Sequence, residues 1–233
     1  MLEEDRVVVI TGSSKGIGKH IAAAFVLQGW KVYGINRSEC ATSCDCLCAD
    51  LATDEGIETS AAYVKDVRPH VLINNAGTNK IQMVGAISSD TVDALFRLNQ
   101  KAPLILSSAA IGQDNSRLYS IVNIGSIWGQ IGCKGRTVYG MTKAAVSSMS
   151  RHMACELKES GVIVNTIAPG FVNTELTAKS EGDLELEQYK NRAGPKKIMD
   201  PAEIVETCLF LSSKRVCAIN GQTIIVDGGV TYG

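Results

Sequence analysis

The sequence predicts a single-domain α/β protein built on a doubly wound parallel sheet of about seven strands. Its 233 residues suit one sizeable domain, and its 45% hydrophobic composition supplies enough apolar side chains for a full core. Short β-rich runs alternate with longer helical patterns, as parallel strands joined by crossover helices do. The run VVVI near the N-terminus is apolar without alternation, which is typical of a strand covered on both faces.

The elements follow one another without an internal repeat, a low-complexity tract or a linker, so no second domain is expected. We expect strands at 6–10, 31–35, 44–49, 70–73, 119–124, 162–167 and 223–227. We expect helices at 16–28, 54–66, 90–112, 138–159 and 201–212. A polar stretch at about 173–198, rich in Glu, Lys and Gly, lies before the last helix, and we expect it to form a mobile substrate lid.

Charge and hydropathy exclude several classes of partner. The net charge is −1 with no block of like charges, so we expect neither a nucleic-acid partner nor an anionic membrane surface. The first six residues carry three acidic side chains, unlike the basic start of a signal peptide. No apolar run approaches the ~18 residues that span a bilayer. The expected location is the cytoplasm.

Four of the eight cysteines, Cys40, Cys44, Cys46 and Cys48, lie close together in the sequence. Disulfides in an oxidising compartment and a zinc site are both alternatives for such a cluster. However, the last three cysteines have the period of a strand, so they share one face, and no histidine lies nearby. We therefore favour reduced, buried cysteines that pack in the core, and we expect no metal site.

A glycine-rich turn follows the first strand and opens the first helix. In the segment TGSSKGIG at 11–18, Gly12 would allow a sharp turn, Gly16 would let the backbone approach a pyrophosphate, and Gly18 would let the helix pack closely. The N-terminus of the helix offers unpaired N–H groups to phosphates. The alternative is a turn whose glycines serve only packing.

The residues after the second strand indicate which dinucleotide binds. NAD sites usually carry a carboxylate there for the ribose 2′-hydroxyl, whereas this chain has Asn36 and Arg37. A guanidinium can bind a 2′-phosphate through two hydrogen bonds, and Lys15 adds a second cation. These residues favour NADP, although both cations are also compatible with an ordinary solvated surface.

Tyr139 and Lys143 are four residues apart at the start of a helix, so they share a helix face. An ammonium beside a tyrosine lowers the pKa of the phenol, which can then exchange a proton with a carbonyl or an alcohol. On spacing alone, an ordinary surface pair is the better interpretation. Ser126 follows another strand and NNAG at 74–77 follows a third, and ligands of open α/β sheets bind at that edge. Asn99 is a polar residue in a predicted helix, where a capped kink is the alternative role.

These motifs together resemble the short-chain dehydrogenase/reductase family over essentially the whole chain, with a Rossmann fold. The matching features are TGSSKGIG at 11–18, Asp50, NNAG at 74–77, Asn99, Ser126, YGMTK at 139–143, PG at 169–170, Asn173-Thr174 and DGG at 227–229. The resemblance implies that Tyr139 is the general acid/base, that Lys143 lowers its pKa and binds the nicotinamide ribose, that Ser126 orients the carbonyl, and that Asn99 holds a water in a proton relay.

The resemblance also implies the cofactor contacts. These would come from Gly12, Ser14, Lys15, Gly16, Ile17, Gly18, Asn36, Arg37, Asp50, Leu51, Asn75, Ala76, Gly77, Tyr139, Lys143, Pro169, Gly170, Val172 and Thr174. One feature departs from the family pattern, because only about seven residues at 37–43 join the second and third strands, where the family places a helix. The helix is expected to be lost or reduced to a turn.

The C-terminal run DPAEIVETCLFLSS…INGQTIIVDGG is similar to that of 3-oxoacyl-acyl-carrier-protein reductases, which implies reduction of a 3-oxoacyl thioester by NADPH. The alternatives are a dehydrogenase of sugars, polyols or small ketones, an extended-type epimerase or dehydratase, and a non-catalytic NADP-binding regulator. Trp128, Gln130, Cys133 and the 173–198 stretch would form the substrate walls. The family resemblance also implies a homotetramer built through helices 90–112 and 138–159.

Overall fold

The computed structural model describes residues 6–38, 44–112, 116–175 and 198–232. Its core is a seven-stranded sheet, all parallel, in the order β3-β2-β1-β4-β5-β6-β7, so the predicted fold class is confirmed. The strands are β1 (Val7–Thr11), β2 (Lys31–Asn36), β3 (Asp45–Cys48), β4 (Val71–Asn74), β5 (Ser120–Ile124), β6 (Ile163–Pro169) and β7 (Thr223–Val226). The strand order reverses direction between β1 and β4, which is where doubly wound sheets bind their ligands.

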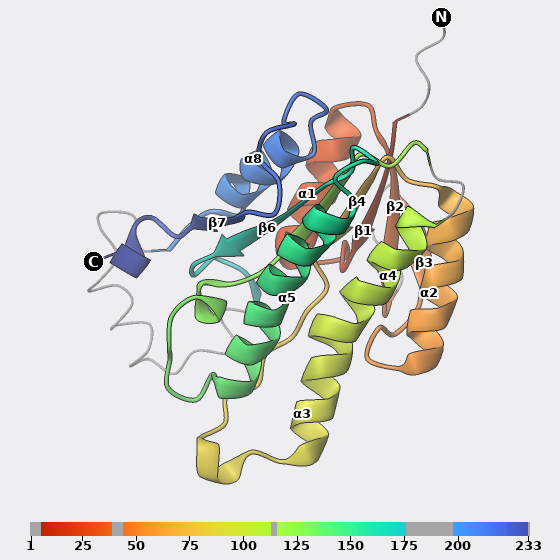
Figure 1. Ribbon diagram of the computed structural model, residues 1–233. Helices are drawn as coiled ribbons and strands as arrows, with labels where there is room; N and C mark the ends of the chain where they lie inside the picture. The colour runs from red at the N-terminus through yellow and green to blue at the C-terminus, as the bar shows by residue number, and fades with distance from the viewer. Residues whose placement is uncertain (1–5, 39–43, 113–115, 176–197, 233) are drawn as a thin grey trace, which may run out of the picture.

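Helices cover both faces of the sheet (Figure 1). On one face α1 (Gly16–Leu27) packs against α8 (Pro201–Leu211). On the other face lie α2 (Asp54–Val67), α4 (Ala102–Ile111) and α5 (Thr137–Glu156). Each face has its own hydrophobic core, and β1 is buried from end to end between them. The apolar run VVVI is therefore explained by burial on both sides.

The helix predicted at 90–112 is interrupted in the structure. It consists of α3 (Ser89–Phe96), a π-helical turn at Arg97–Lys101, and α4. Asn99 lies in this turn and is 1% exposed. The prediction of one continuous helix was wrong at this point. A single π-helical turn changes the hydrophobic periodicity too little to be recognised in the sequence.

Of the cysteine cluster, Cys40 lies outside the described residues, Cys44 directly precedes the edge strand β3, and Cys46 and Cys48 belong to it; the prediction that these cysteines are buried in the core was wrong for the described ones. Cys44 and Cys46 are half-buried and Cys48 is exposed. Cys46 also forms a disulfide, so packing is not its only role. The strand pairs with β2 alone, and no helix covers it within the described residues of the short connection after Asn36. The period-two pattern correctly predicted a shared face but could not show how well that face is covered.

One further expectation concerns a segment with few described residues. The expected lid at 173–198 falls mostly on residues 176–197, which lie outside the described part of the chain. Within the described residues, no helix combines the length and the apolar character that crossing a membrane requires. Nor do the described His, Cys, Asp and Glu residues form a group of three suited to holding a metal ion.

Candidate active site

The predicted site residues gather at one edge of the sheet because all strands are parallel. β1 ends at Thr11, β4 at Asn74, β5 at Ile124 and β6 at Pro169, and each continues into a segment that carries candidate residues. Figure 1 shows that these strand ends lie together, facing the N-terminal ends of α1 and α5. The position of the site therefore follows from the topology alone.

The glycine turn has the backbone geometry that its sequence predicts. Gly12 and Gly16 have φ values of 68° and 54°, in the left-handed region that favours glycine. A Cβ at Gly18 would lie 2.2 Å from the carbonyl oxygen of Gly12, so only glycine allows the helix to approach this closely. Asn75 secures the turn, since its Nδ2 donates to the carbonyls of Thr11 at 2.9 Å and Gly12 at 3.1 Å.

The N-terminus of α1 fits the phosphates of a dinucleotide. Lys15 is its N-cap residue, with no side-chain cap hydrogen bond and no acidic residue in the first helical turn. By contrast, side chains cap α2, α3 and α8. The first N–H groups of α1 are thus available to an anion, which the helix dipole also favours. Thr174 lies opposite the turn, its Cβ 3.8 Å from the Cβ position of Gly16. Ser14 and Ile17 belong to the same turn and are half-buried.

Asn36 ends β2, and its side chain contacts the glycine turn. It is 4% exposed, and its Oδ1 accepts from the Ser14 N–H at 3.0 Å while its Nδ2 donates to Ser13 Oγ at 3.0 Å. Asn36 therefore braces the glycine turn. Arg37 and Lys15 are both exposed at this edge and are the two cations that face solvent there.

The remaining predicted cofactor residues lie along the same edge. Asp50 accepts the Ala52 N–H on its Oδ1 at 2.9 Å, and Leu51 is 4% exposed in the core. The backbone N–H groups of Asn75 and Ala76 both donate to Thr11 Oγ1, at 3.0 and 2.9 Å. This pair of bonds joins the end of β4 to the end of β1, so the two walls of the expected channel are tied together.

The segment after β6 forms the opposite wall. Pro169 is the last residue of β6, and the Gly170 N–H donates to the carbonyl of Val226 at 2.9 Å. Val172 is buried and forms an isolated bridge with Met199. These contacts hold the chain close to the end of the sheet just before Thr174. The predicted nicotinamide-binding segment therefore starts from a fixed backbone.

Ser126 and Tyr139 are brought together at the C-terminal end of β5. Ser126 is 7% exposed, its Oγ accepts the Trp128 N–H at 3.2 Å, and it hydrogen-bonds the Tyr139 hydroxyl. Burial raises the pKa of Tyr139 above its usual value, while the bond from Ser126 and the charge of Arg136 lower it. Because burial is the largest effect, Tyr139 is protonated at neutral pH and is ready to donate.

Lys143 lies one helical turn after Tyr139 and points into the same space. It is 5% exposed, and its Nζ donates to the carbonyl of Ile124 at 2.8 Å and lies 5.8 Å from the centroid of the Tyr139 ring. Burial lowers the pKa of Lys143 to about 8. An ammonium in this position is only partly compensated by one carbonyl, so an additional acceptor there would be bound strongly.

Asn99 joins the loop after β4 to α5. Its Oδ1 accepts the Thr78 N–H at 3.0 Å, and its Nδ2 donates to the Thr78 carbonyl at 2.9 Å and to Thr142 Oγ1 at 3.1 Å. A Cβ added at Gly77 would lie 3.3 Å from both Asn99 Oδ1 and Lys143 Nζ, which shows how tightly these groups converge. The side chain of Asn99 is thus a structural link beside Lys143.

Sequence reasoning missed Arg136. This residue is 4% exposed and stands at the N-cap position of α5, without a side-chain capping hydrogen bond, three positions before Tyr139. The charge of its guanidinium lowers the pKa of the Tyr139 phenol. The sequence offered only one signal, an arginine three residues before a candidate catalytic tyrosine, and such a residue is usually solvated.

The expected substrate walls are only partly assembled by the described residues. Trp128 packs edge-to-face on Phe171 with ring centroids 5.8 Å apart, which makes an apolar wall. Gln130 instead donates to Ser147 Oγ at 3.1 Å on α5, and Cys133 is half-buried. Of the expected walls, the described residues therefore provide the Trp128–Phe171 pair.

Comparison with known proteins decides the family. A family described as enoyl-(acyl carrier protein) reductase matches residues 12–231. The chain belongs to the short-chain dehydrogenase/reductase family. This dehydrogenase/reductase is 31% identical to the 3-oxoacyl-(acyl-carrier-protein) reductase FabG of Vibrio harveyi over 240 residues, which cover 97% of this chain and 98% of the relative.

Solved structures agree with this assignment. A protein assigned as an NAD(P)-dependent gluconate 5-dehydrogenase from Beutenbergia cavernae, with bound NADP, superposes with a TM-score of 0.91 at 28% identity, covering 98% of this chain and 97% of that chain. A 4-hydroxyisoleucine dehydrogenase complexed with NADH and succinate gives a TM-score of 0.88 at 26% identity, covering 97% and 100%. The protein is an oxidoreductase that uses a nicotinamide cofactor and acts on CH–OH or C=O groups.

Proposed function

We propose that this protein reduces a ketone to a secondary alcohol with NADPH, and that its substrate is a 3-oxoacyl thioester. The observation that carries this proposal is the convergence of Ser126, Tyr139 and Lys143 at the sheet edge that also holds the open N-terminus of α1. Carbonyl reduction by a dinucleotide needs a proton donor, a hydroxyl that orients the carbonyl and a site for the phosphates, and all three lie at this edge.

The catalytic residues divide the reaction between them. The nicotinamide supplies a hydride to the carbonyl carbon when the cofactor is bound. Tyr139 donates its phenolic proton to the carbonyl oxygen, and Ser126 donates a hydrogen bond to the same oxygen. Lys143 holds a positive charge beside the phenol, which stabilises the phenolate that remains after transfer. In the reverse direction the phenolate takes the proton of an alcohol.

The preference for NADPH follows from the groups near the end of β2. Arg37 and Lys15 are exposed cations, and Asn36 stands where NAD sites usually carry a carboxylate. A neutral Asn36 does not repel a 2′-phosphate, while the guanidinium of Arg37 can bind it through two hydrogen bonds. Both cations supply binding energy only to the phosphorylated cofactor.

The choice of a 3-oxoacyl thioester rests on the relatives and on the apolar wall. The Vibrio harveyi relative bears the name of that activity and matches this chain over nearly its full length. Trp128 and Phe171 form an apolar surface that suits an acyl chain.

A second candidate is a dehydrogenase of hydroxy acids, and Arg136 is the observation that favours it. Its buried guanidinium lies within electrostatic range of Tyr139, where a carboxylate of the substrate would find a strong partner. Gluconate and 4-hydroxyisoleucine, which appear in the names of two structural relatives, both carry a carboxylate. This candidate goes beyond the dehydrogenases of sugars, polyols or small ketones that were the alternatives from the sequence.

A panel assay separates the two candidates. NADPH absorbance is followed with acetoacetyl-N-acetylcysteamine as the neutral thioester and with acetoacetate and 5-ketogluconate as carboxylates. We expect turnover of the thioester, with kcat/KM about tenfold or more above either carboxylate. Turnover of carboxylates alone, lost in Arg136→Gln, would assign the second candidate. Cofactor binding without turnover of any compound would indicate a non-catalytic regulator.

A further inference from the structure

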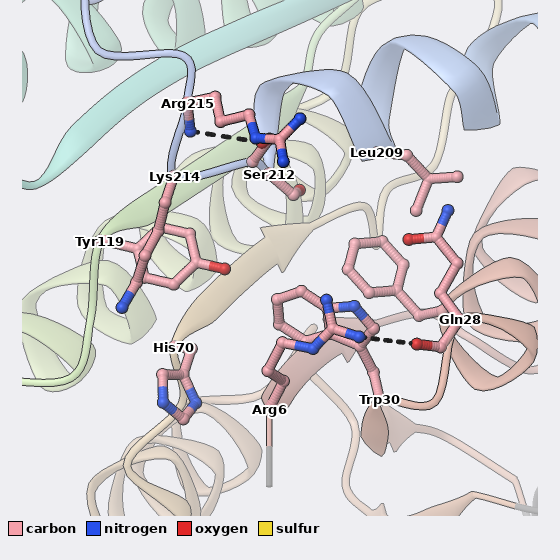
Figure 2. Close-up of a pocket in the computed structure, with 11 residues that line it drawn as sticks. Arg6, Gln28, Trp30, His70, Tyr119, Leu209, Ser212, Lys214 and Arg215 are labelled. Carbon is pink, nitrogen blue, oxygen red and sulfur yellow. Dashed lines mark hydrogen bonds between the residues drawn. The ribbon is translucent and has the colours of Figure 1, made fainter. Parts of the chain in front are cut away.

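A second hollow lies at the opposite edge of the sheet from the catalytic residues (Figure 2). It has a volume of about 340 Å³ and is lined by residues just before three strands, Arg6 before β1, His70 before β4 and Tyr119 before β5. The C-terminal ends of α1 and α8 close it with Gln28 and Ser213. Because parallel strands separate their two ends, this hollow is distinct from the cofactor site.

The charges around the hollow have one sign. Arg6, Lys214 and Arg215 line it, and no carboxyl group does so among the described residues. By contrast, Arg97 and Lys101 on another part of the surface pair with the carboxylate of Asp54. A cluster of cations around a concavity creates a positive electrostatic potential there, and this potential attracts anions.

Aromatic rings hold two of these cations in place. The Arg6 guanidinium carbon lies 4.9 Å from the centre of the Trp30 ring, and one of its nitrogens donates to the Gln28 carbonyl at 2.8 Å. The Lys214 Nζ lies 5.0 Å from the centre of the Tyr119 ring. Figure 2 shows these two cation–aromatic pairs on either side of the same open space. The hollow therefore offers flat apolar surface directly beside positive charge.

The buried indole donor in this wall lacks a hydrogen-bond partner. Trp30 is 8% exposed, and its Nε1–H makes no hydrogen bond. Leaving a buried donor unsatisfied costs about 1–3 kcal/mol, so such groups usually have an acceptor in the functional state. The indole can only donate, which again selects for an acceptor-rich ligand. Burial also raises the pKa of Tyr119 to about 12, so this hydroxyl is a second permanent donor.

We propose that this hollow binds a small organic anion, a phosphate or carboxylate attached to a flat apolar group. The anionic oxygens would contact Arg6 and Lys214, while the apolar part would lie against the aromatic rings. The volume suits a molecule of about the size of one substituted ring. The site goes beyond the proposed reaction, because none of its residues belongs to the catalytic edge.

Phenyl phosphate is the probe, titrated by calorimetry into the full-length protein saturated with NADP⁺. The saturating cofactor occupies the phosphate cradle of α1, so any remaining binding has another location. We expect one phenyl phosphate per chain and a change in tryptophan fluorescence that Trp30→Phe abolishes. Phenol, which lacks the charge, is expected to bind about tenfold or more weakly.

Charge-neutral variants locate the site. Lys214→Gln/Arg215→Gln should weaken phenyl phosphate about tenfold or more, while Lys65→Gln/Lys158→Gln, which removes two exposed charges elsewhere, should leave the Kd unchanged. Both variants should keep wild-type kcat, which verifies their folding. An equal Kd in the two double variants, or no binding to the NADP⁺-saturated protein, would overturn the proposal.

The carboxylates of Glu3, Glu4 and Asp5 are anions that belong to the chain itself, so they are the alternative occupant of the hollow. A Glu3→Gln/Glu4→Gln/Asp5→Asn variant separates the two sources. An unchanged Kd for phenyl phosphate supports a free ligand as the occupant. A Kd about tenfold tighter would mean that these carboxylates compete for the hollow, which would overturn its assignment to a free ligand.

Discussion

At the scale of single residues, the catalytic edge combines opposing electrostatic effects in a small space. Burial raises the pKa of Tyr139 and lowers that of Lys143 to about 8, so each side chain is pushed toward its neutral form. The hydroxyl of Ser126 and the charge of Arg136 act against this on the phenol. A protonated tyrosine suits the donor role in reduction, whereas oxidation of an alcohol requires the phenolate.

The buried Lys143 leads to a prediction about stability and pH. Its pKa is about 8 in the folded protein and about 10.4 in an unfolded chain, so above pH 8 the unfolded state binds more protons. The free energy of unfolding should therefore rise with pH across this window. We expect a gain of about 1–2 kcal/mol between about pH 7.5 and 9.5 that is absent in Lys143→Met. Urea unfolding without cofactor measures it, and equal pH slopes in both proteins would contradict the buried ammonium.

Arg37 leads to a prediction about cofactor choice. Arg37→Ala should lower kcat/KM for NADPH about 10–100-fold and leave that for NADH nearly unchanged, because only NADPH carries the 2′-phosphate. Arg151→Ala removes an exposed arginine from α5 and serves as the matched control. Steady-state kinetics with both cofactors give the ratio, and an equal loss for NADPH and NADH would refute the role of Arg37.

At the scale of elements, the sequence predicted well those features that depend on local backbone chemistry. Gly12 and Gly18 were assigned to a turn and a close helix contact, and the structure gives both the geometry expected. Features set by neighbours could not be predicted in this way. The π-helical turn around Asn99 keeps the helical hydrophobic pattern, and the exposure of Cys48 depends on a missing cover over β3. This cover is missing among the described residues, and neither feature leaves a signal within its own segment.

The π-helical turn leads to a prediction about Asn99. Asn99→Ala removes three hydrogen bonds to Thr78 and Thr142 from a buried position, so we expect a loss of about 1–3 kcal/mol in the free energy of unfolding. Activity should fall as well, because the loop that ends beside Lys143 loses its anchor. Chemical denaturation and kcat are measured together. Wild-type stability with reduced kcat would instead assign Asn99 to the proton relay alone.

At the scale of the whole molecule, the parallel sheet decides where function can lie. Its carboxyl edge gathers Ser126, Tyr139 and Lys143 from β5 and α5, and its opposite edge gathers the cations around Arg6 and Lys214. The first assembly could be predicted, because each residue belongs to a motif that follows a strand. The second could not, since its members come from unrelated loops and share no pattern. Arg136 escaped prediction for the same reason, because burial is a property of the whole fold.

The exposed apolar residues on two helices lead to a prediction about assembly. We propose a homotetramer that uses α4 and α5, on which Leu104 and Met141 are 47% and 54% exposed. Light scattering should give four times the mass of one chain, and Leu104→Glu should reduce it because a charge would be buried at the interface. Thr59→Glu places the same charge on exposed α2 as a control. A wild-type monomer would contradict the proposal.

The central claim is that Tyr139 gives the proton that completes carbonyl reduction. Tyr139→Phe removes only the hydroxyl and keeps the ring beside Lys143, so the most direct test measures turnover and NADPH binding on this one variant. We predict an NADPH Kd within about twofold of wild type and a kcat lowered about 10²–10⁴-fold on the substrate that the panel identifies. A kcat close to that of wild type, with the cofactor bound normally, would contradict the account.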